Sequence, residues 1–75
     1  MKELIEYVAR SLCDEPDAVK VEVREGPTTV YALSVAPADL GKVIGRQGRT
    51  VKALRTLVSA RAEALRQRAT LEVLD

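Results

Sequence analysis

The spacing of apolar residues changes several times along the chain, and each change predicts a different element. Residues 3–13 (ELIEYVARSLC) repeat apolar side chains every three or four positions, which is typical of an amphipathic helix. Residues 19–25 (VKVEVRE) and 29–36 (TVYALSVA) alternate instead, as half-buried strands do, and the turn residues 25–28 predict a hairpin between them. The predicted apolar faces comprise Leu4, Ile5, Val8, Ala9 and Leu12 in the helix, and Val19, Val21, Val23, Tyr31, Leu33 and Val35 in the strands.

The second half of the chain predicts two helices and a final strand. Pro37 ends the second strand and begins a short helix over residues 37–44 (PADLGKVI). A longer helical pattern runs from about Arg49 to Gln67, and residues 69–75 alternate again. The predicted apolar stripe of the longer helix comprises Val51, Leu54, Leu57, Val58, Ala62 and Leu65. The order helix–strand–strand–helix–helix–strand predicts an α+β fold, with three helices on one face of a three-stranded mixed sheet. If the last strand lies parallel to the second, the helix pair forms a crossover, which is right-handed as a rule.

Length and composition narrow the function. The chain has 75 residues, so we expect one domain over residues 1–75, with a thin core and no enclosed catalytic pocket. It has no histidine and one cysteine, which disfavours an enzyme, a metal site or a cofactor, and we expect Cys13 to be a small apolar residue at a helix end. The sequence contains no apolar run of about 20 residues and no signal-peptide pattern at Met1, so we expect a cytoplasmic protein.

Charge is distributed unevenly along the chain. Residues 1–40 contain four basic and eight acidic side chains, whereas residues 41–75 contain eight basic and three acidic ones. Between Lys42 and Arg61 there are six basic residues and no acidic one. A stretch of one sign favours an anionic partner. The alternative is that these residues form salt bridges with the acidic first half of the same fold.

Two of the four glycines lie within this basic stretch, in KVIGRQGRTV (residues 42–51). We expect Gly45 to end the short helix in a left-handed conformation and Gly48 to begin the long one, leaving backbone N–H groups free to bind a phosphate. The basic residues around this turn form a predicted cationic rim: Lys42, Arg46, Arg49 and Lys52. The alternative is a tight turn between helices that binds no ligand.

Other phosphate-binding motifs do not fit. A P-loop would need a glycine where the chain has Val43. The glycines at positions 41, 45 and 48 are spaced four and three apart, which excludes the dinucleotide-binding fingerprint.

The segment VIGRQGRTV resembles the signature of KH domains, whose GXXG loop clamps four nucleotides of single-stranded nucleic acid. The element order is similar to that of type II (bacterial) KH domains. Through KELIEYVARSL, VAPADLGKVIGRQG and LEVLD, the whole chain resembles the small stand-alone bacterial KH proteins of the KhpA type. In one respect the chain departs from the expected pattern, because no glycine after Gly48 closes the long helix. The pattern therefore does not predict where that helix ends.

The resemblance implies a non-catalytic, RNA chaperone-like protein that binds single-stranded RNA and works as a homodimer or with a larger KH-containing partner. It assigns the loop to Gly45, Arg46, Gln47 and Gly48, and places Val43, Ile44 and Val51 where they line or support a groove for nucleotides. Lys42, Arg49 and Lys52 complete the predicted site.

Two further functions remain open. A helix-turn-helix protein would place the long helix in the major groove of DNA, although its turn needs no glycine pair. A KH fold that has lost RNA binding would serve as a protein-interaction module. The chain has only two aromatic residues, so extensive base stacking is not expected, and we expect Tyr31 to lie in the core. The remaining arginines (Arg55, Arg61, Arg66 and Arg68) are expected to be ordinary surface or ion-pair residues rather than RNA contacts.

Overall fold

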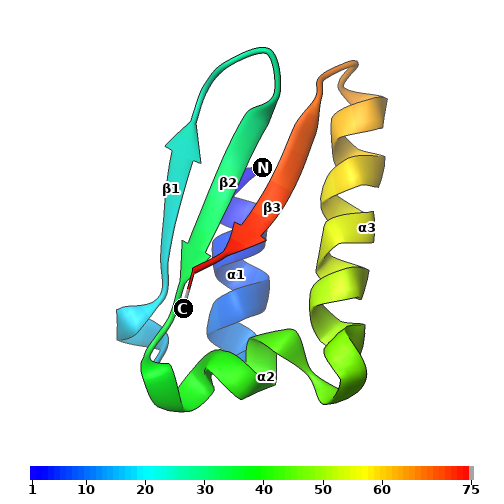
Figure 1. The fold of residues 1–75 in the computed structure, drawn as a ribbon. Coiled ribbons are helices and arrows are strands. Elements are labelled where there is room, and N and C mark those ends of the chain that lie inside the picture. Colours follow the sequence, from blue (N-terminus) through cyan, green and yellow to red (C-terminus); the bar gives the residue numbers. More distant parts are fainter. Residues whose placement is uncertain (75) are drawn as a thin grey trace.

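Three strands form one sheet, and the helices lie on one of its faces (Figure 1). The computed structural model describes residues 1–74. In chain order the elements are α1 (Lys2–Leu12), β1 (Lys20–Arg24), β2 (Thr29–Ser34), α2 (Leu40–Ile44), α3 (Arg49–Ala64) and β3 (Ala69–Val73). Short 3-10 turns precede β1, α2 and α3: η1 (Pro16–Ala18), η2 (Pro37–Asp39) and η3 (Arg46–Gly48). The predicted α+β order is confirmed.

The sheet is mixed and has the order β1-β2-β3. The hairpin strands β1 and β2 pair antiparallel, with Val21 opposite Leu33, whereas β2 and β3 pair parallel, with Tyr31 opposite Leu71. The parallel ladder extends to both ends of β3, because the Thr29 N–H donates to the Arg68 carbonyl at 2.9 Å and the Leu74 N–H donates to the Leu33 carbonyl at 2.8 Å. The chain between β2 and β3 is therefore a crossover through α2 and α3.

The core lies between the sheet and the helices. It includes Ile5 and Ala9 of α1, Leu54 and Val58 of α3, and strand residues such as Leu33. Tyr31 is 9% exposed, which confirms the prediction that it packs inside rather than presenting a ring to a ligand. Cys13 follows α1, is half-buried and packs against the core, as expected of an apolar residue at a helix end. Burial, followed by the negative charge of Asp39, raises the pKa of the Cys13 thiol.

Four residues of the predicted apolar faces are 36–43% exposed, and in this the prediction was wrong: Leu12, Val23, Leu57 and Leu65. Leu12 and Val23 lie at the ends of α1 and β1, and Leu65 lies just after α3. Leu57 lies in α3 between the buried positions Leu54 and Val58. Periodicity identifies the face of an element, but burial also needs a neighbouring element that covers it.

The end of α3 shows what replaces the missing glycine. The Arg66 N–H donates to the Glu63 carbonyl at 3.0 Å and the Gln67 N–H donates to the Ala62 carbonyl at 2.8 Å. These two bonds form a Schellman motif, which needs a left-handed residue at its centre. Arg66 occupies that position with φ of 56°. A non-glycine residue therefore ends the helix, at a local conformational cost.

Among residues 1–74, no helix combines the length and the apolar character needed to cross a membrane.

Candidate nucleic-acid interface

The turn between α2 and α3 requires glycine at its first position. Gly45 has φ of 77° and ψ of 170°, a region that is essentially restricted to glycine. A Cβ at Gly45 would lie 2.7 Å from the Thr50 Cβ and 2.9 Å from the Thr50 nitrogen, with the Thr50 hydroxyl closer still. The Gly45 N–H donates to the Gly41 carbonyl at 2.8 Å and so ends α2. The prediction of a left-handed helix end was wrong in detail, because ψ places Gly45 outside the left-handed helical region.

The two residues that follow Arg46 are left-handed. Gln47 has φ of 58° and ψ of 26°, and Gly48 has φ of 71° and ψ of 16°. No atom lies within 4 Å of a Cβ placed on Gly48, so conformation rather than space favours glycine there. The Gly48 N–H donates to the Gly45 carbonyl at 3.1 Å, and the Arg49 N–H donates to the Arg46 carbonyl. The loop therefore uses one of the α3 N–H groups that the sequence predicted to be free.

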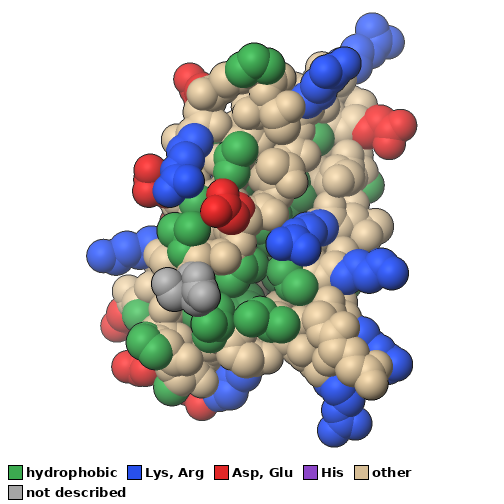
Figure 2. All heavy atoms as spheres, viewed as in Figure 1, with side chains coloured by type: hydrophobic (Ala, Val, Ile, Leu, Met, Phe, Trp, Pro, Cys, Tyr) green, Lys and Arg blue, Asp and Glu red, His purple; other side chains and the backbone are tan. Residues whose placement is uncertain are grey.

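Three of the four predicted rim residues are exposed and unopposed by acid. Arg46, Arg49 and Lys52 are exposed, and within residues 1–74 none of them forms an ion pair. The Arg49 Nη2 donates to the Gln47 Oε1 at 3.3 Å, which links the first turn of α3 to the loop. Figure 2 shows basic side chains following the α3 side of the molecule from the α2–α3 turn upward. This part of the surface can attract an anion.

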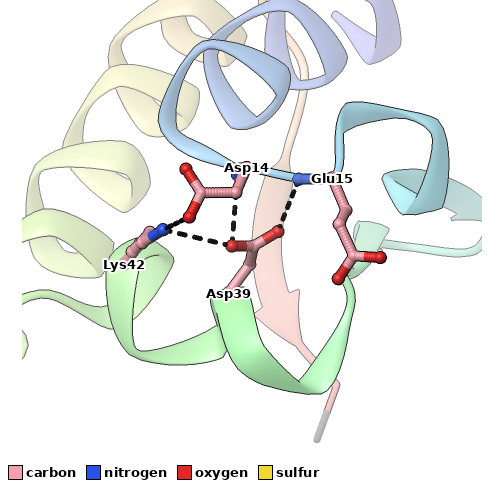
Figure 3. A network of polar contacts seen from close by, with 4 residues as sticks. All are labelled: Asp14, Glu15, Asp39 and Lys42. Atoms are coloured by element: carbon pink, nitrogen blue, oxygen red, sulfur yellow. Dashed lines mark hydrogen bonds and ion pairs between the residues drawn. The ribbon is translucent and has the colours of Figure 1, made fainter.

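Lys42, the fourth predicted rim residue, belongs to a different cluster (Figure 3). Its Nζ contacts the Asp14 carboxylate and lies 3.5 Å from Asp39 Oδ1. Asp39 is only 1% exposed, and its two oxygens also accept the backbone N–H groups of Asp14 at 3.1 Å and Glu15 at 3.0 Å. These contacts hold α2 against the segment that follows α1, and the two carboxylates compensate the charge of Lys42.

Titration in this cluster follows from its hydrogen bonds. The Glu15 N–H is the main cause of the lowered pKa of Asp39, with smaller contributions from the Asp14 N–H and from Lys42. The hydrogen bond to Asp14 is the main cause of the raised pKa of Lys42. Both shifts favour the charged forms, the carboxylate of Asp39 and the ammonium of Lys42. Sequence reasoning missed Asp39, since an acid at the start of a helix is usually an exposed residue near the helix dipole.

The apolar residues around the loop divide between core and surface. Val43 is fully buried in the core, so its side chain supports the loop from inside and offers no surface to a ligand. Ile44 is 37% exposed and Val51 is half-buried. Figure 2 shows hydrophobic side chains gathered between the carboxyl end of β3 and the α2–α3 turn, next to the basic side chains of α3. Cationic and aliphatic surfaces thus adjoin at one end of the molecule.

A GXXG turn between two helices, on an αββααβ fold with a mixed three-stranded sheet, defines a KH domain of the type II order. The family model described as "KhpA/KhpB, KH domain" matches residues 2–73. The chain therefore belongs to the KhpA/KhpB family of KH domains.

Curated relatives agree along their whole length. The chain is 49% identical to an RNA-binding protein KhpA of Halalkalibacterium halodurans, with all of both chains covered. It is 43% identical to an RNA-binding protein KhpA of Chlamydia pneumoniae, covering 100% of this chain and 97% of the relative. A crystal structure of a variant of Aquifex aeolicus Era, bound to GDP and aluminium fluoride, matches 96% of this chain and 28% of its own length, with a TM-score of 0.64 and 20% identity. The similarity to Era concerns the fold alone.

Proposed function

We propose that this protein binds single-stranded RNA and holds the sugar-phosphate backbone at its GXXG loop. One observation carries the proposal: a Cβ placed on Gly48 would lie in open space, so the loop backbone is accessible there, and the neighbouring Arg46, Arg49 and Lys52 form no ion pair within residues 1–74. A backbone without side chains at this point allows another chain to approach closely. The full-length relatives, named as RNA-binding proteins, support the same function.

In this proposal the rim and the aliphatic surface have separate tasks. Arg46, Arg49 and Lys52 contact phosphates, while Ile44 and Val51 border the surface on which bases lie. Lys42 must leave Asp14 before it can contact RNA, so we assign it a smaller part than the sequence suggested. Base stacking on aromatic rings contributes little, because Tyr31 is buried and the other tyrosine, Tyr7, lies on α1.

The protein acts by binding and is not an enzyme. Duplex DNA is the less favoured ligand, because the strained turn serves no purpose in a helix-turn-helix motif, and bases within a duplex are not splayed onto such a surface. An RNA chaperone-like role in the cytoplasm agrees with a small site that reads few bases.

Oligomer formation is part of the proposal. A clamp for four nucleotides with few phosphate contacts gives weak, salt-sensitive binding. A second copy of the chain, or a larger protein that contains a KH domain, would raise the affinity through effective concentration. Sedimentation of the protein alone, and with RNA, measures this directly. A monomer at all concentrations, with no KH-containing protein in a pull-down, would count against it.

The sequence provides a matched control for a test of the loop. The dipeptide Arg46-Gln47 recurs as Arg66-Gln67 at the other end of α3, and both dipeptides include a residue with positive φ. We compare the variant Arg46→Asp, Gln47→Asp with the variant Arg66→Asp, Gln67→Asp, which makes the same change in charge. Binding to labelled single-stranded RNA, single-stranded DNA and duplex DNA is measured by fluorescence anisotropy at two salt concentrations, after circular dichroism confirms that each variant is folded.

The loop variant should lose binding to single strands, whereas the control should keep most of it. Wild-type affinity should fall with salt, with a slope of about −2 for three phosphate contacts at roughly −0.7 each. If both variants lost the same amount of affinity for RNA, the change in net charge alone would explain the loss. A preference for duplex would favour the helix-turn-helix alternative.

A further inference from the structure

Arg55 lies outside the predicted site, yet the structure gives it an unusual position. It belongs to α3, and its Nε donates to the Leu71 carbonyl of β3 at 3.3 Å in a partly buried bond. No carboxylate among residues 1–74 forms an ion pair with it, whereas Arg10, Arg24 and Lys42 all have such partners. A bond through Nε leaves the Nη1 and Nη2 groups as a planar pair of donors.

The carbonyl of Leu71 faces away from the rest of the sheet. Arg68 and Leu74 hydrogen-bond to β2, and backbone groups alternate in direction along a strand. The groups of Ala69, Leu71 and Val73 therefore point to the free edge of β3, which is an edge strand. Arg55 spans the junction between this edge and α3.

The distance from the loop matches the size of the expected ligand. Two turns of α3, about 10 Å along its axis, separate Gly48 from Arg55. Gly48, Lys52 and Arg55 also follow one another on one side of the helix, at spacings of three and four residues. Four nucleotides cover at least about 10 Å in three steps of roughly 3.4 Å each. A strand clamped at the loop and running along α3 therefore reaches Arg55 with its last nucleotide.

The chemistry around Arg55 suits a base better than a phosphate. The free edge of β3 presents both N–H and C=O groups. A base edge carries both donors and acceptors and can pair with both kinds of group, whereas a phosphate oxygen only accepts and leaves the carbonyls without a partner. The guanidinium itself only donates, so it favours an edge with two adjacent acceptors, such as cytosine O2 and N3 or guanine O6 and N7. Adenine places an amino donor beside each acceptor on the corresponding edges.

We propose that Arg55 is a specificity-determining residue, whose guanidinium reads a base with two adjacent acceptors at the end of the four-nucleotide footprint. This inference rests on the proposed binding of single-stranded RNA at the GXXG loop. It differs from the sequence-based expectation, which treated Arg55 as an ordinary surface residue.

The test uses two substitutions that separate charge from shape. Arg55→Lys keeps the charge and removes the planar pair of donors, whereas Arg55→Gln removes the charge as well. Arg61→Gln, on the same helix but farther from the loop, is the control. The probes are labelled RNA strands of about eight nucleotides, twice the footprint. One contains adenosine alone, and in the others alternate nucleotides are cytidine or guanosine.

Wild type and Arg61→Gln should prefer a cytidine- or guanosine-containing strand over oligoadenosine by about tenfold. Both Arg55 variants should lose this preference while remaining able to bind. Equal affinity of wild type for all strands would overturn the inference. So would a phosphate signature, in which Arg55→Lys resembles wild type and Arg55→Gln weakens every strand equally, with a smaller salt slope.

The loop variant Arg46→Asp, Gln47→Asp separates the two proposals. If it abolishes binding while the Arg55 variants behave as wild type, the inference fails and the proposed function stands. If it binds every strand as wild type does, the proposed function has failed and the inference falls with it.

Discussion

Replacing each loop glycine by alanine should destabilise the protein to very different degrees. At Gly48 the new Cβ meets no atom within 4 Å, so only the left-handed conformation, at φ of 71°, is penalised. That penalty is about 1–2 kcal/mol. At Gly45 the conformation is restricted to glycine, which costs about 1–3 kcal/mol, and the Cβ also overlaps Thr50, which adds about 1–3 kcal/mol for overpacking. We therefore expect Gly45→Ala to cost about 2–6 kcal/mol.

The loss can be measured by urea unfolding followed by circular dichroism. With a slope of roughly 1 kcal/mol per molar urea for a domain of this size, Gly48→Ala should lower the midpoint by about 1–2 M. Gly45→Ala should lower it by at least twice as much or prevent folding. Removing the Thr50 side chain in the double variant Gly45→Ala, Thr50→Gly should restore part of the loss, because it removes the two nearest atoms, the Thr50 hydroxyl oxygen and Cβ. Equal effects of the two alanines, or no restoration, would refute this account of the loop.

Four further predictions concern the core, the end of α3, the buried carboxylate and the lysine that pairs with it. Val43→Ala should lower the free energy of unfolding by about 2 kcal/mol and have little effect on the RNA affinity of the folded protein. Ile44→Ala should instead lower the RNA affinity and have little effect on the free energy of unfolding. Urea unfolding and RNA titration measure the two quantities. Arg66→Gly should raise the stability by about 1 kcal/mol, seen as a melting temperature about 4–8 °C higher, because glycine adopts φ of 56° without strain. Asp39 has a pKa below its ordinary 3.8, so its ionised carboxylate stabilises the fold above that pH, and this stabilisation is lost as the pH falls below it. The variant Asp39→Asn should therefore be less stable at neutral pH, and its stability should depend less on pH in acid unfolding. Lys42 has a pKa above 10.5, so its ammonium group stabilises the fold below that pH, and this stabilisation is lost as the pH rises above it. In the variant Lys42→Met, the free energy of unfolding should therefore fall less at alkaline pH.

The first three of these have the following contrary results. Equal loss of RNA affinity in the Val43 and Ile44 variants would contradict the division between core and surface. A lower melting temperature for Arg66→Gly would mean that the Arg66 side chain contributes more than its conformation costs. If the stability of Asp39→Asn depended on acidic pH as strongly as that of wild type, the hydrogen bonds to Asp39 would not be what lowers its pKa.

Local patterns predicted the elements well because each depends on its own residues. The alternating valines of β1, the Pro37 boundary and the helical repeat of α3 all specify structure within a few positions. The GXXG motif could also be recognised from the sequence, because the two glycines and their basic neighbours are close together in it. The order of elements predicted a mixed sheet and left the parallel pairing of the last strand as a condition, which the β2–β3 pairing meets.

Contacts between distant residues could not be predicted in the same way. Lys42 looked like part of a cationic rim because its sequence neighbours are basic, but Asp14 and Asp39 determine its surroundings. Arg55 is exposed, as expected of a surface residue, but its hydrogen bond to the Leu71 carbonyl of β3 could not be foreseen from the sequence. Leu57 fits the apolar repeat of α3 and is nevertheless exposed. In each case the tertiary fold determines what one side chain meets.

The central claim is that RNA is held at the GXXG loop, and an NMR titration of the isotope-labelled protein with short single-stranded RNA tests it most directly. The account predicts that the amide signals of residues 45–49 shift first and most, that those of the first turns of α3 and of β3 follow, and that the signals of β1 stay in place. Shifts confined to α1 or β1, with the loop amides unchanged, would contradict it.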